Sequence, residues 1–411
     1  MIYYRRCILI AVVLLSCPSL VWGNEFRLVP SISIKEEYND NIFFLTDDIR
    51  NDFITTISPS LEMVNNTEKL ETNLSARLDR FDYADNREIS ATDQLYKGKI
   101  RYRATSLFGI SAEAGYVRDS QPGRDIETSG IILSAVPRNR YNASLSADYQ
   151  LSEKTAAGVS YAFGRDDYES ARYTGYTSHD VNAGLVYDMG RYFQRVKGRV
   201  NLGYSNYVFP DSRIDAVMST AGFSLALSEK GSLLIDGGVR HTWSEFSVAE
   251  PEYMYINIGG GIYIPIFIGY VKSPQKNDGW GWVGNMSLLY EGERGNGSLT
   301  YNRDITPASG LNGAVERNAL MLSARYRMTY EFSILFSGGY YTNKSDAGQF
   351  SAQVIDERTI RVSPGVRYEF SKNIYLESFY DYTAVDYLKS NTSAHRNFLS
   401  MRLYMQYPIF E

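Results

Sequence analysis

Two stretches of alternating residues joined by a short turn constrain the fold of this chain most strongly. Between Asp356 and Asp386, apolar and polar side chains alternate on both sides of a polar turn at 371–373, with one interruption at Phe379. Alternation with period two puts one set of side chains in an apolar medium and the other in a polar medium, as in a half-buried antiparallel hairpin. Each arm is about ten residues or slightly longer, the length at which a tilted strand crosses a bilayer. The hairpin alone fits either a soluble sandwich or a membrane barrel.

The same pattern recurs along the chain and distinguishes these two folds. Two nearly identical turns, at 151–154 and 227–230, each join a pair of alternating strands. Short connections lie near 66, 106, 153, 191, 229, 331 and 372, and longer ones at 39–51, 84–93, 120–139, 168–178, 245–252, 295–315, 345–355 and 387–393. Short turns on one rim and long loops on the other are typical of outer-membrane barrels. We therefore predict an all-β, transmembrane, antiparallel up-and-down barrel of about eighteen strands, with roughly fourteen or sixteen as alternatives.

One connection departs from this arrangement. Residues 272–279 should form a turn on the short rim by their place in the count, yet the segment is long and follows the most apolar run of the chain after the leader, 262–271. Trp280 and Trp282 come directly after it. Tryptophan near a rim is most often a membrane-interface anchor. The alternative is that this turn docks a periplasmic partner.

The N-terminus has the features of an export signal. Arg5 and Arg6 precede a short apolar run, and small or compact residues before position 24 predict cleavage after Gly23. Lipid attachment at Cys17 is the competing interpretation. Because the only cysteines are Cys7 and Cys17, the mature chain would carry no thiol, which suits an oxidising compartment. We predict a signal peptide at 1–23 and one barrel domain at 24–411.

Composition supports an exported β protein. The chain has 34 Tyr and 33 Gly but only 12 Pro and 3 His, and after the leader no apolar run reaches the length of about 18 residues that a transmembrane helix needs. Aromatic girdles at the two membrane interfaces account for the many tyrosines. A net charge of -5 gives no indication of a nucleic-acid partner.

Several stretches of the chain carry a family resemblance: PSIS at 30–33, EYNDNIF at 37–43, FITTISP at 53–59, and the run from RYN at 140–142 through YQLSEKT at 149–155. They resemble the β-barrel porin family linked to bacterial polysaccharide secretion. The resemblance covers most of the mature chain but consists of strand and turn patterns. It implies an exit channel for a secreted polysaccharide in the outer membrane, working beside a periplasmic export protein, and it implies no catalytic residues.

No reactive cluster is evident in the sequence. His179, His241 and His395 fall in or beside different strands, with no neighbouring cysteine to complete a metal site. No nucleophile elbow or phosphate-binding glycine loop is present. We therefore expect no enzyme, no metal and no cofactor. The expected partners are outer-membrane lipid, the barrel-assembly machinery that reads the C-terminal strand, and the periplasmic export protein that the resemblance implies.

Basic side chains on the polar faces are the candidate site. They are Lys97, Lys99, Arg101, Arg103, Arg195, Lys197, Arg199, Arg325, Arg327, Arg361, Arg367 and Arg402. One interpretation is a pore that favours anions. The other is pairing with acids on neighbouring strands, such as Glu71 and Glu377. Three functions stay open: a polysaccharide exit channel, a general or anion-preferring diffusion porin, and a plugged structural or receptor barrel.

Overall fold

The computed structural model describes residues 25–121, 123–126, 135–258, 260–346, 348–350 and 354–409. The predicted signal peptide at 1–23 lies outside these residues, as does Cys17, so both interpretations of the leader remain predictions.

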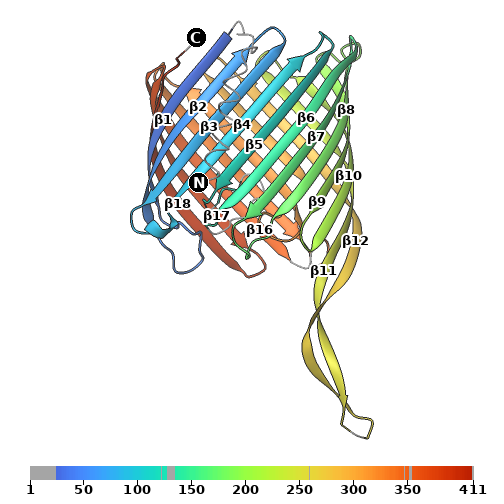
Figure 1. The fold of residues 1–411 in the computed structure, drawn as a ribbon. Coiled ribbons are helices and arrows are strands. Elements are labelled where there is room, and N and C mark those ends of the chain that lie inside the picture. The colour runs from blue at the N-terminus through green and yellow to red at the C-terminus, as the bar shows by residue number, and fades with distance from the viewer. Residues whose placement is uncertain are drawn as a thin grey trace, which may run out of the picture.

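The chain folds into one closed barrel of 18 antiparallel strands (Figure 1). Neighbours in the sheet are neighbours in the chain, and β1 pairs with both β2 and β18, which closes the ring. The predicted fold class and strand number are confirmed. The strands are β1 (Glu25–Asn39), β2 (Asp52–Asn66), β3 (Leu70–Tyr83), β4 (Ala91–Arg103), β5 (Phe108–Asp119), β6 (Arg138–Ser152), β7 (Thr155–Tyr168), β8 (Tyr176–Asp188), β9 (Val196–Val208), β10 (Ser212–Ala226), β11 (Gly231–Asn257), β12 (Tyr263–Glu291), β13 (Gly295–Pro307), β14 (Ala314–Arg327), β15 (Phe332–Ser345), β16 (Ile355–Ser371), β17 (Ile374–Tyr387) and β18 (Thr392–Gln406), with one 3₁₀ turn, η1 (Arg87–Ile89).

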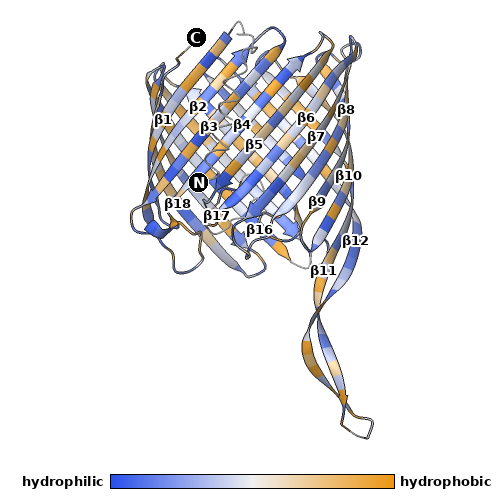
Figure 2. Ribbon diagram, in the orientation of Figure 1, coloured by the Kyte–Doolittle hydropathy of each residue, from blue (hydrophilic) through white to orange (hydrophobic). Residues whose placement is uncertain are grey.

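Hydrophobic and hydrophilic residues alternate along the strands (Figure 2). This alternation puts one set of side chains on the outer face and the other on the inner face. In β18, Leu399, Met401 and Met405 are exposed on the outside, whereas Ser400 between them is buried. The inner face is identified by ion pairs that skip a strand, such as Arg325 on β14 with Glu369 on β16, 2.9 Å apart. Such pairs form on the concave side of a sheet. An apolar exterior around a polar interior is the arrangement of a membrane-spanning barrel.

The two rims differ as the sequence predicts. The rim that carries the start of β1 and the end of β18, here the short-turn rim, has connections at 67–69, 104–107, 153–154, 189–195, 227–230, 292–294, 328–331 and 372–373. The opposite, long-loop rim has connections at 40–51, 84–90, 120–137, 169–175, 209–211, 258–262, 308–313, 346–354 and 388–391. One predicted loop is wrong: most of 295–315 is strand β13. The segment has the many Gly, Asn and Ser residues that are typical of a loop. It is nevertheless a strand of the wall, where the inner face accepts small polar side chains.

The largest correction concerns β11 and β12. The predicted loop at 245–252 lies within β11, and the predicted short-rim turn at 272–279 lies within β12, paired with 242–249. The two strands project from the long-loop rim as a twisted ribbon (Figure 1), with the connection at its far end. Period-two alternation is lost along this ribbon because neither face lies against the barrel wall. The sequence therefore lacks the signal by which its strands could be recognised. The segment 272–279 is strand on the side of the long-loop rim and is not a turn of the short-turn rim.

Candidate functional site

The predicted basic residues fall almost entirely on the inner face. In β4, Tyr96, Ile100 and Tyr102 are exposed on the outside, so the alternate residues Lys97, Lys99, Arg101 and Arg103 face the lumen. The same alternation places Lys197 and Arg199 of β9, Arg325 and Arg327 of β14, Arg361 and Arg367 of β16, and Arg402 of β18 on the inner face. Arg195 instead lies in the turn before β9, with a φ of 62°.

Five of these side chains are paired with acids. The pairs are Arg103 with Glu71 at 2.9 Å, Arg199 with Asp236 at 3.6 Å, Arg325 with Glu369 at 2.9 Å, Arg361 with Asp381 at 2.6 Å, and Arg367 with Glu377. For these five the interpretation as charge pairing between strands holds.

The other seven form no ion pair with any residue in the described ranges. They are Lys97, Lys99, Arg101, Arg195, Lys197, Arg327 and Arg402. β4, β14 and β18 end at the short-turn rim and β9 begins there, so these cations lie between the middle of the barrel and that rim. Charge left unpaired in a water-filled lumen acts on passing ions.

A segment of the β5–β6 connection crosses the lumen. Ile126, 2% exposed, packs on Ala319 of β14 and Tyr341 of β15, which lie nearly opposite β5 and β6 in the ring. Arg317 of β14 donates a hydrogen bond to the carbonyl oxygen of Ile126 at 3.3 Å. We call residues 120, 121, 123–126 and 135–137 the crossing segment. It occupies part of the lumen.

Gly123 allows the crossing segment to approach the far wall. Its φ of 73° lies in the left-handed region, which favours glycine. A Cβ atom there would lie 3.1 Å from Ile126 Cδ1 and 3.3 Å from Arg396 Nη1 on β18. A larger residue at this position would be strained and crowded.

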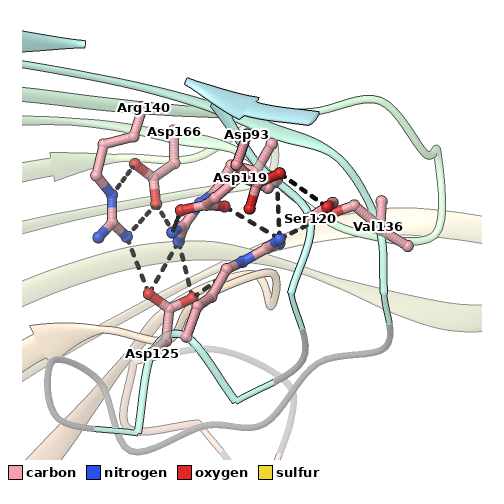
Figure 3. Close-up of polar contacts among 9 residues, drawn as sticks. Asp93, Asp119, Ser120, Asp125, Val136, Arg140 and Asp166 are labelled. Carbon is pink, nitrogen blue, oxygen red and sulfur yellow. Dashed lines mark hydrogen bonds and ion pairs between the residues drawn. The ribbon is translucent and has the colours of Figure 1, made fainter. Parts of the chain in front are cut away.

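A buried charge network joins the crossing segment to the wall of β5, β6 and β7 (Figure 3). Arg138, 1% exposed at the start of β6, donates to both carboxylate oxygens of Asp125 at 2.8 and 2.9 Å. It also binds Asp166 of β7 at 3.2 Å and Asp119 of β5 at 2.7 Å. Arg140 binds Asp166 at 2.6 Å and Asp125 at 3.3 Å. Each of these five charged groups therefore has at least one oppositely charged partner, as buried charges require.

Arg124 completes the network from the crossing segment itself. Its Nη1 donates to the carbonyl oxygens of Asp119 at 3.1 Å and Val136 at 2.8 Å, which joins the two ends of the segment. Three arginines thus face three aspartates, Asp119, Asp125 and Asp166. The network is close to neutral, so it holds the segment and offers little free charge to a solute.

The pKa values of the loop groups agree with this role. Burial alone would raise the pKa of the Asp125 carboxyl, but Arg138 and Arg140 beside it lower that pKa below its ordinary value. Burial lowers the pKa of the Arg124 guanidinium, partly offset by Asp119. Asp125 is therefore held ionised well into the acid range.

Other loops cover the long-loop mouth. Phe350 of the β15–β16 connection packs against Tyr207, Phe209 and Ile214 of the β9–β10 region. Thr174 of the β7–β8 connection forms an isolated bridge with Gly310 of the β13–β14 connection. Asn277 of the projecting ribbon donates to the carbonyl oxygen of Gly348 at 2.8 Å. Loops from several sides of the ring thus meet above the lumen.

The three histidines lie apart and have ordinary surroundings. His179 shares a 2.8 Å hydrogen bond with Tyr161, and His241 lies between Trp243 and Trp280. Within the described ranges, no group of His, Cys, Asp and Glu residues is arranged to hold a metal ion. Among the same residues, no helix is long and apolar enough to cross a membrane.

The sequence analysis missed the network around Arg138. A signal was present: Arg138 and Arg140 alternate at the start of a strand, and Asp166 ends the next one. The sequence does not show that Asp125, which lies in a loop, contacts both Arg138 and Arg140.

Comparisons with known proteins concern the fold. No protein-family model matches the sequence, and no curated protein is significantly similar to it. Solved structures similar to this chain include the ferric-catecholate import receptor Fiu of E. coli K12 in its open form, with 9% identity, a TM-score of 0.47 and coverage of 93% of this chain and 82% of the receptor. OccK2 (OpdF) of Pseudomonas aeruginosa has 9% identity, a TM-score of 0.46 and coverage of 95% and 99%. Acinetobacter baumannii OccAB4 has 10% identity, a TM-score of 0.44 and coverage of 94% and 99%.

Proposed function

We propose that this protein is an outer-membrane channel through which small polar solutes diffuse along the barrel axis. An apolar exterior around a closed 18-stranded wall suits a lipid bilayer, and a barrel of this size encloses an aqueous passage. Both described chain ends lie on the short-turn rim, as in outer-membrane barrels whose short turns face the periplasm.

The crossing segment carries the proposal. The segment contacts β14 and β15 through Ile126 and is held to β6 through the Asp125–Arg138 pair, which leaves a restricted passage. A permanently wide duct for a polymer would need that space free. The geometry therefore favours small solutes over the polysaccharide that the sequence resemblance implies.

The unpaired cations suggest which solutes pass. Lys97, Lys99 and Arg101 form a continuous stripe on β4. None of them forms an ion pair with a described residue, although Glu113 and Glu71 are the ladder neighbours of Lys99 and Arg101. In a lumen of low ionic screening, such a stripe raises the local concentration of anions. We propose a preference for small anions.

A loop replacement tests the axial channel. Asp119 and Arg138 are directly opposite in the β5–β6 ladder, so a two-residue Asn-Gly turn can replace 120–137 without shifting the register. The variant should conduct more in planar bilayers and admit larger sugars in liposome swelling. A matched control replaces 249–272 of the projecting ribbon, between the paired Val248 and Ser273, with the same turn and should conduct like the wild type.

Two outcomes would contradict this proposal. Equal conductance of the wild type and the loop replacement would show that the crossing segment does not restrict the passage. An absence of conductance in all three folded proteins would favour the plugged structural barrel.

Polysaccharide export is the second candidate, and one observation favours it. Tyr375 of β17 and Tyr404 of β18 face the lumen near the short-turn rim with stacked rings 4.7 Å apart, and the Arg367 guanidinium lies 4.4 Å from the Tyr375 ring. An aromatic platform beside a cation suits stacking of acidic sugars. If it binds them, an acidic oligosaccharide should block the ion current, and Tyr404→Ala should relieve the block; equal block in both proteins would remove this candidate.

A further inference from the structure

The barrel wall is weakest between β12 and β13. Their ladder has eight residue pairs, from Gly284 with Arg303 to Glu291 with Asn296. The next shortest, between β1 and β18, has nine pairs and is extended by backbone hydrogen bonds from Tyr407 and Ile409 to β1. Residues 304–307 of β13 are still strand, yet they form no ladder with β12.

β12 and β13 separate because the β11–β12 hairpin and the β13–β14 hairpin point in different directions beyond Gly284. β12 continues outward with β11 as the projecting ribbon. The end of the β13–β14 hairpin is instead enclosed: the successive residues Ala314 and Val315 are 1% and 0% exposed, although their side chains point to opposite faces. Both faces of that end are covered, because Ala314 belongs to a cluster with Tyr207 and Ile214, and Val315 to a cluster with Ala308 and Ile355.

Side chains close the gap that this separation leaves. Arg240 of β11 is on the inner face and only 3% exposed. Its Nη2 lies 2.8 Å from Glu316 Oε1, and its Nη1 lies 3.2 Å from Asp304 Oδ1. Arg303 of β13 lies over the ring of Trp282, which is exposed on the outer face, at 4.3 Å. The Nη2 of Arg303 lies 3.0 Å from Glu316 Oε2. One carboxylate is therefore shared by an arginine from the lumen side and an arginine from the outer side.

The two arginines can share one carboxylate only if no hydrogen-bonded sheet separates them. Gly281 of β12 lies directly beside this contact, because a Cβ atom there would be 2.7 Å from Arg240 Nη2 and 3.3 Å from Glu316 Oε1. The other pairs of neighbouring strands are joined by ladders of nine or more residue pairs. Here the inside and the outside are joined through one side chain.

The gap lies at the edge of the apolar band. Trp280 and Trp282, exposed by 75% and 50%, stand on the outer face beside it. Exposed tryptophans of this kind anchor a barrel where hydrocarbon meets the polar head groups. The gap therefore opens toward the head-group region of the leaflet on the long-loop side.

We propose that the seam between β12 and β13 is a lateral portal for an amphiphile with a single anionic head, a carboxylate or a phosphate, and a hydrocarbon chain. The anionic head replaces the Glu316 carboxylate between Arg240 and Arg303. Arginine side chains in general bind carboxylates and phosphates through two parallel hydrogen bonds. The chain stays outside against Trp282 in the lipid. This route is separate from axial diffusion and requires only that the barrel spans a bilayer.

Photo-crosslinking from the inner side of the seam tests the portal. Val283 is buried on the inner face of β12, one residue beyond the end of the ladder. A photo-crosslinking residue there, in the full protein reconstituted in bilayers with an alkyne fatty acid, should be labelled several-fold more than the same residue at Ser323, which faces the lumen where both neighbouring ladders are intact. An alkyne lysophosphatidic acid distinguishes a phosphate head from a carboxylate, and an alkyne monoacylglycerol supplies the uncharged comparison.

Two sets of variants test whether the Glu316 contacts keep the seam between β12 and β13 closed. Glu316→Gln should increase labelling at 283, whereas Glu369→Gln, which breaks the comparable lumen pair with Arg325 inside an intact wall, should not. Asn285→Cys with Asn302→Cys, directly opposite on the inner face, should form a disulfide that prevents the seam from widening. The locked protein should lose labelling at 283 until it is reduced.

Labelling at 283 no stronger than at 323, in both the wild type and Glu316→Gln, would overturn the portal. Equal labelling by the uncharged monoacylglycerol would overturn the anionic head. Axial conductance is recorded on the same preparations and should be unchanged by the disulfide, so failure of the portal and failure of the axial channel are distinguishable.

Discussion

Single residues decide how open the lumen is. Arg138 contacts three aspartates that come from β5, β7 and the crossing segment, so one guanidinium joins three parts of the chain. Removing one partner from such a buried cluster typically costs about 3–5 kcal/mol, because the remaining charges lose their compensation. The network is thus a strong clamp even though it carries almost no net charge.

The titration of Asp125 predicts how the clamp responds to acid. Its folded-state pKa lies below the ordinary carboxyl value, so the stabilisation it supplies is fully present above that value and is lost as the pH falls through the lowered pKa. Asp119, Asp166, Arg124, Arg138 and Arg140 surround it. Single-channel conductance should therefore rise as the pH falls below about 4. The variant lacking 120–137 should show no such rise; a wild-type conductance that stays constant down to about pH 3 would contradict the clamp.

The β4 stripe gives a second residue-scale prediction. Each such charge, if it faced lipid, would cost roughly 2–4 kcal/mol at the midplane, which agrees with its place on the inner face. Lys99→Glu combined with Arg101→Glu should lower anion preference, measured as a reversal potential across a salt gradient. The exchange Glu71→Arg with Arg103→Glu keeps the net charge of an existing pair and serves as control. Unchanged selectivity in the folded double mutant would assign the stripe a purely structural role.

At the scale of elements, the β11–β12 ribbon differs from every other hairpin. Pairing of β10 with β11 ends at Ser212 and Phe246, so the ribbon beyond that point is held by its own ladder and a few contacts at its base. From Tyr253 to Val271 it carries no charged residue. Its apolar tip is exposed on both faces.

Shortening the ribbon should therefore leave the barrel intact. Replacement of 249–272 by Asn-Gly removes residues outside the wall and keeps the Val248–Ser273 pair. We expect wild-type heat-modifiable migration and an unchanged unfolding midpoint in urea. Replacement of 273–278 instead would delete part of one arm and leave its partner residues on β11 unpaired. A folded barrel from the second variant but not the first would contradict the observed register.

The whole molecule is stabilised by closure of the ring. Every strand has two neighbours, so the ring is closed, with 304–307 of β13 left without a β12 partner, and the polar inner face is shielded from lipid. In detergent, the purified protein should show a strong β signature in circular dichroism and migrate faster on gels when unheated than when boiled. Reducing agent should change neither result, because the only cysteines are Cys7 and Cys17. Identical migration before and after boiling would contradict a closed barrel.

The sequence by itself determined the barrel, its strand number and the inner position of most basic residues. Side-chain direction in a strand is a local property with period two, so Lys99 and Ile100 reveal opposite faces without knowledge of any partner. The same locality explains the error at 272–279. Beyond the bilayer, no medium distinguishes the two faces of a strand, and the alternation that identifies it disappears.

Only the tertiary structure decided which segment occupies the lumen and where the wall is interrupted. Ile126 meets Tyr341, and Asp125 meets Arg138, because ring closure brings opposite strands within reach of one loop. Arg240 and Arg303 share Glu316 because two adjacent hairpins diverge at Gly284. These contacts depend on distances across the ring and on the directions of whole hairpins. Neither quantity is encoded in the spacing of residues along a single strand.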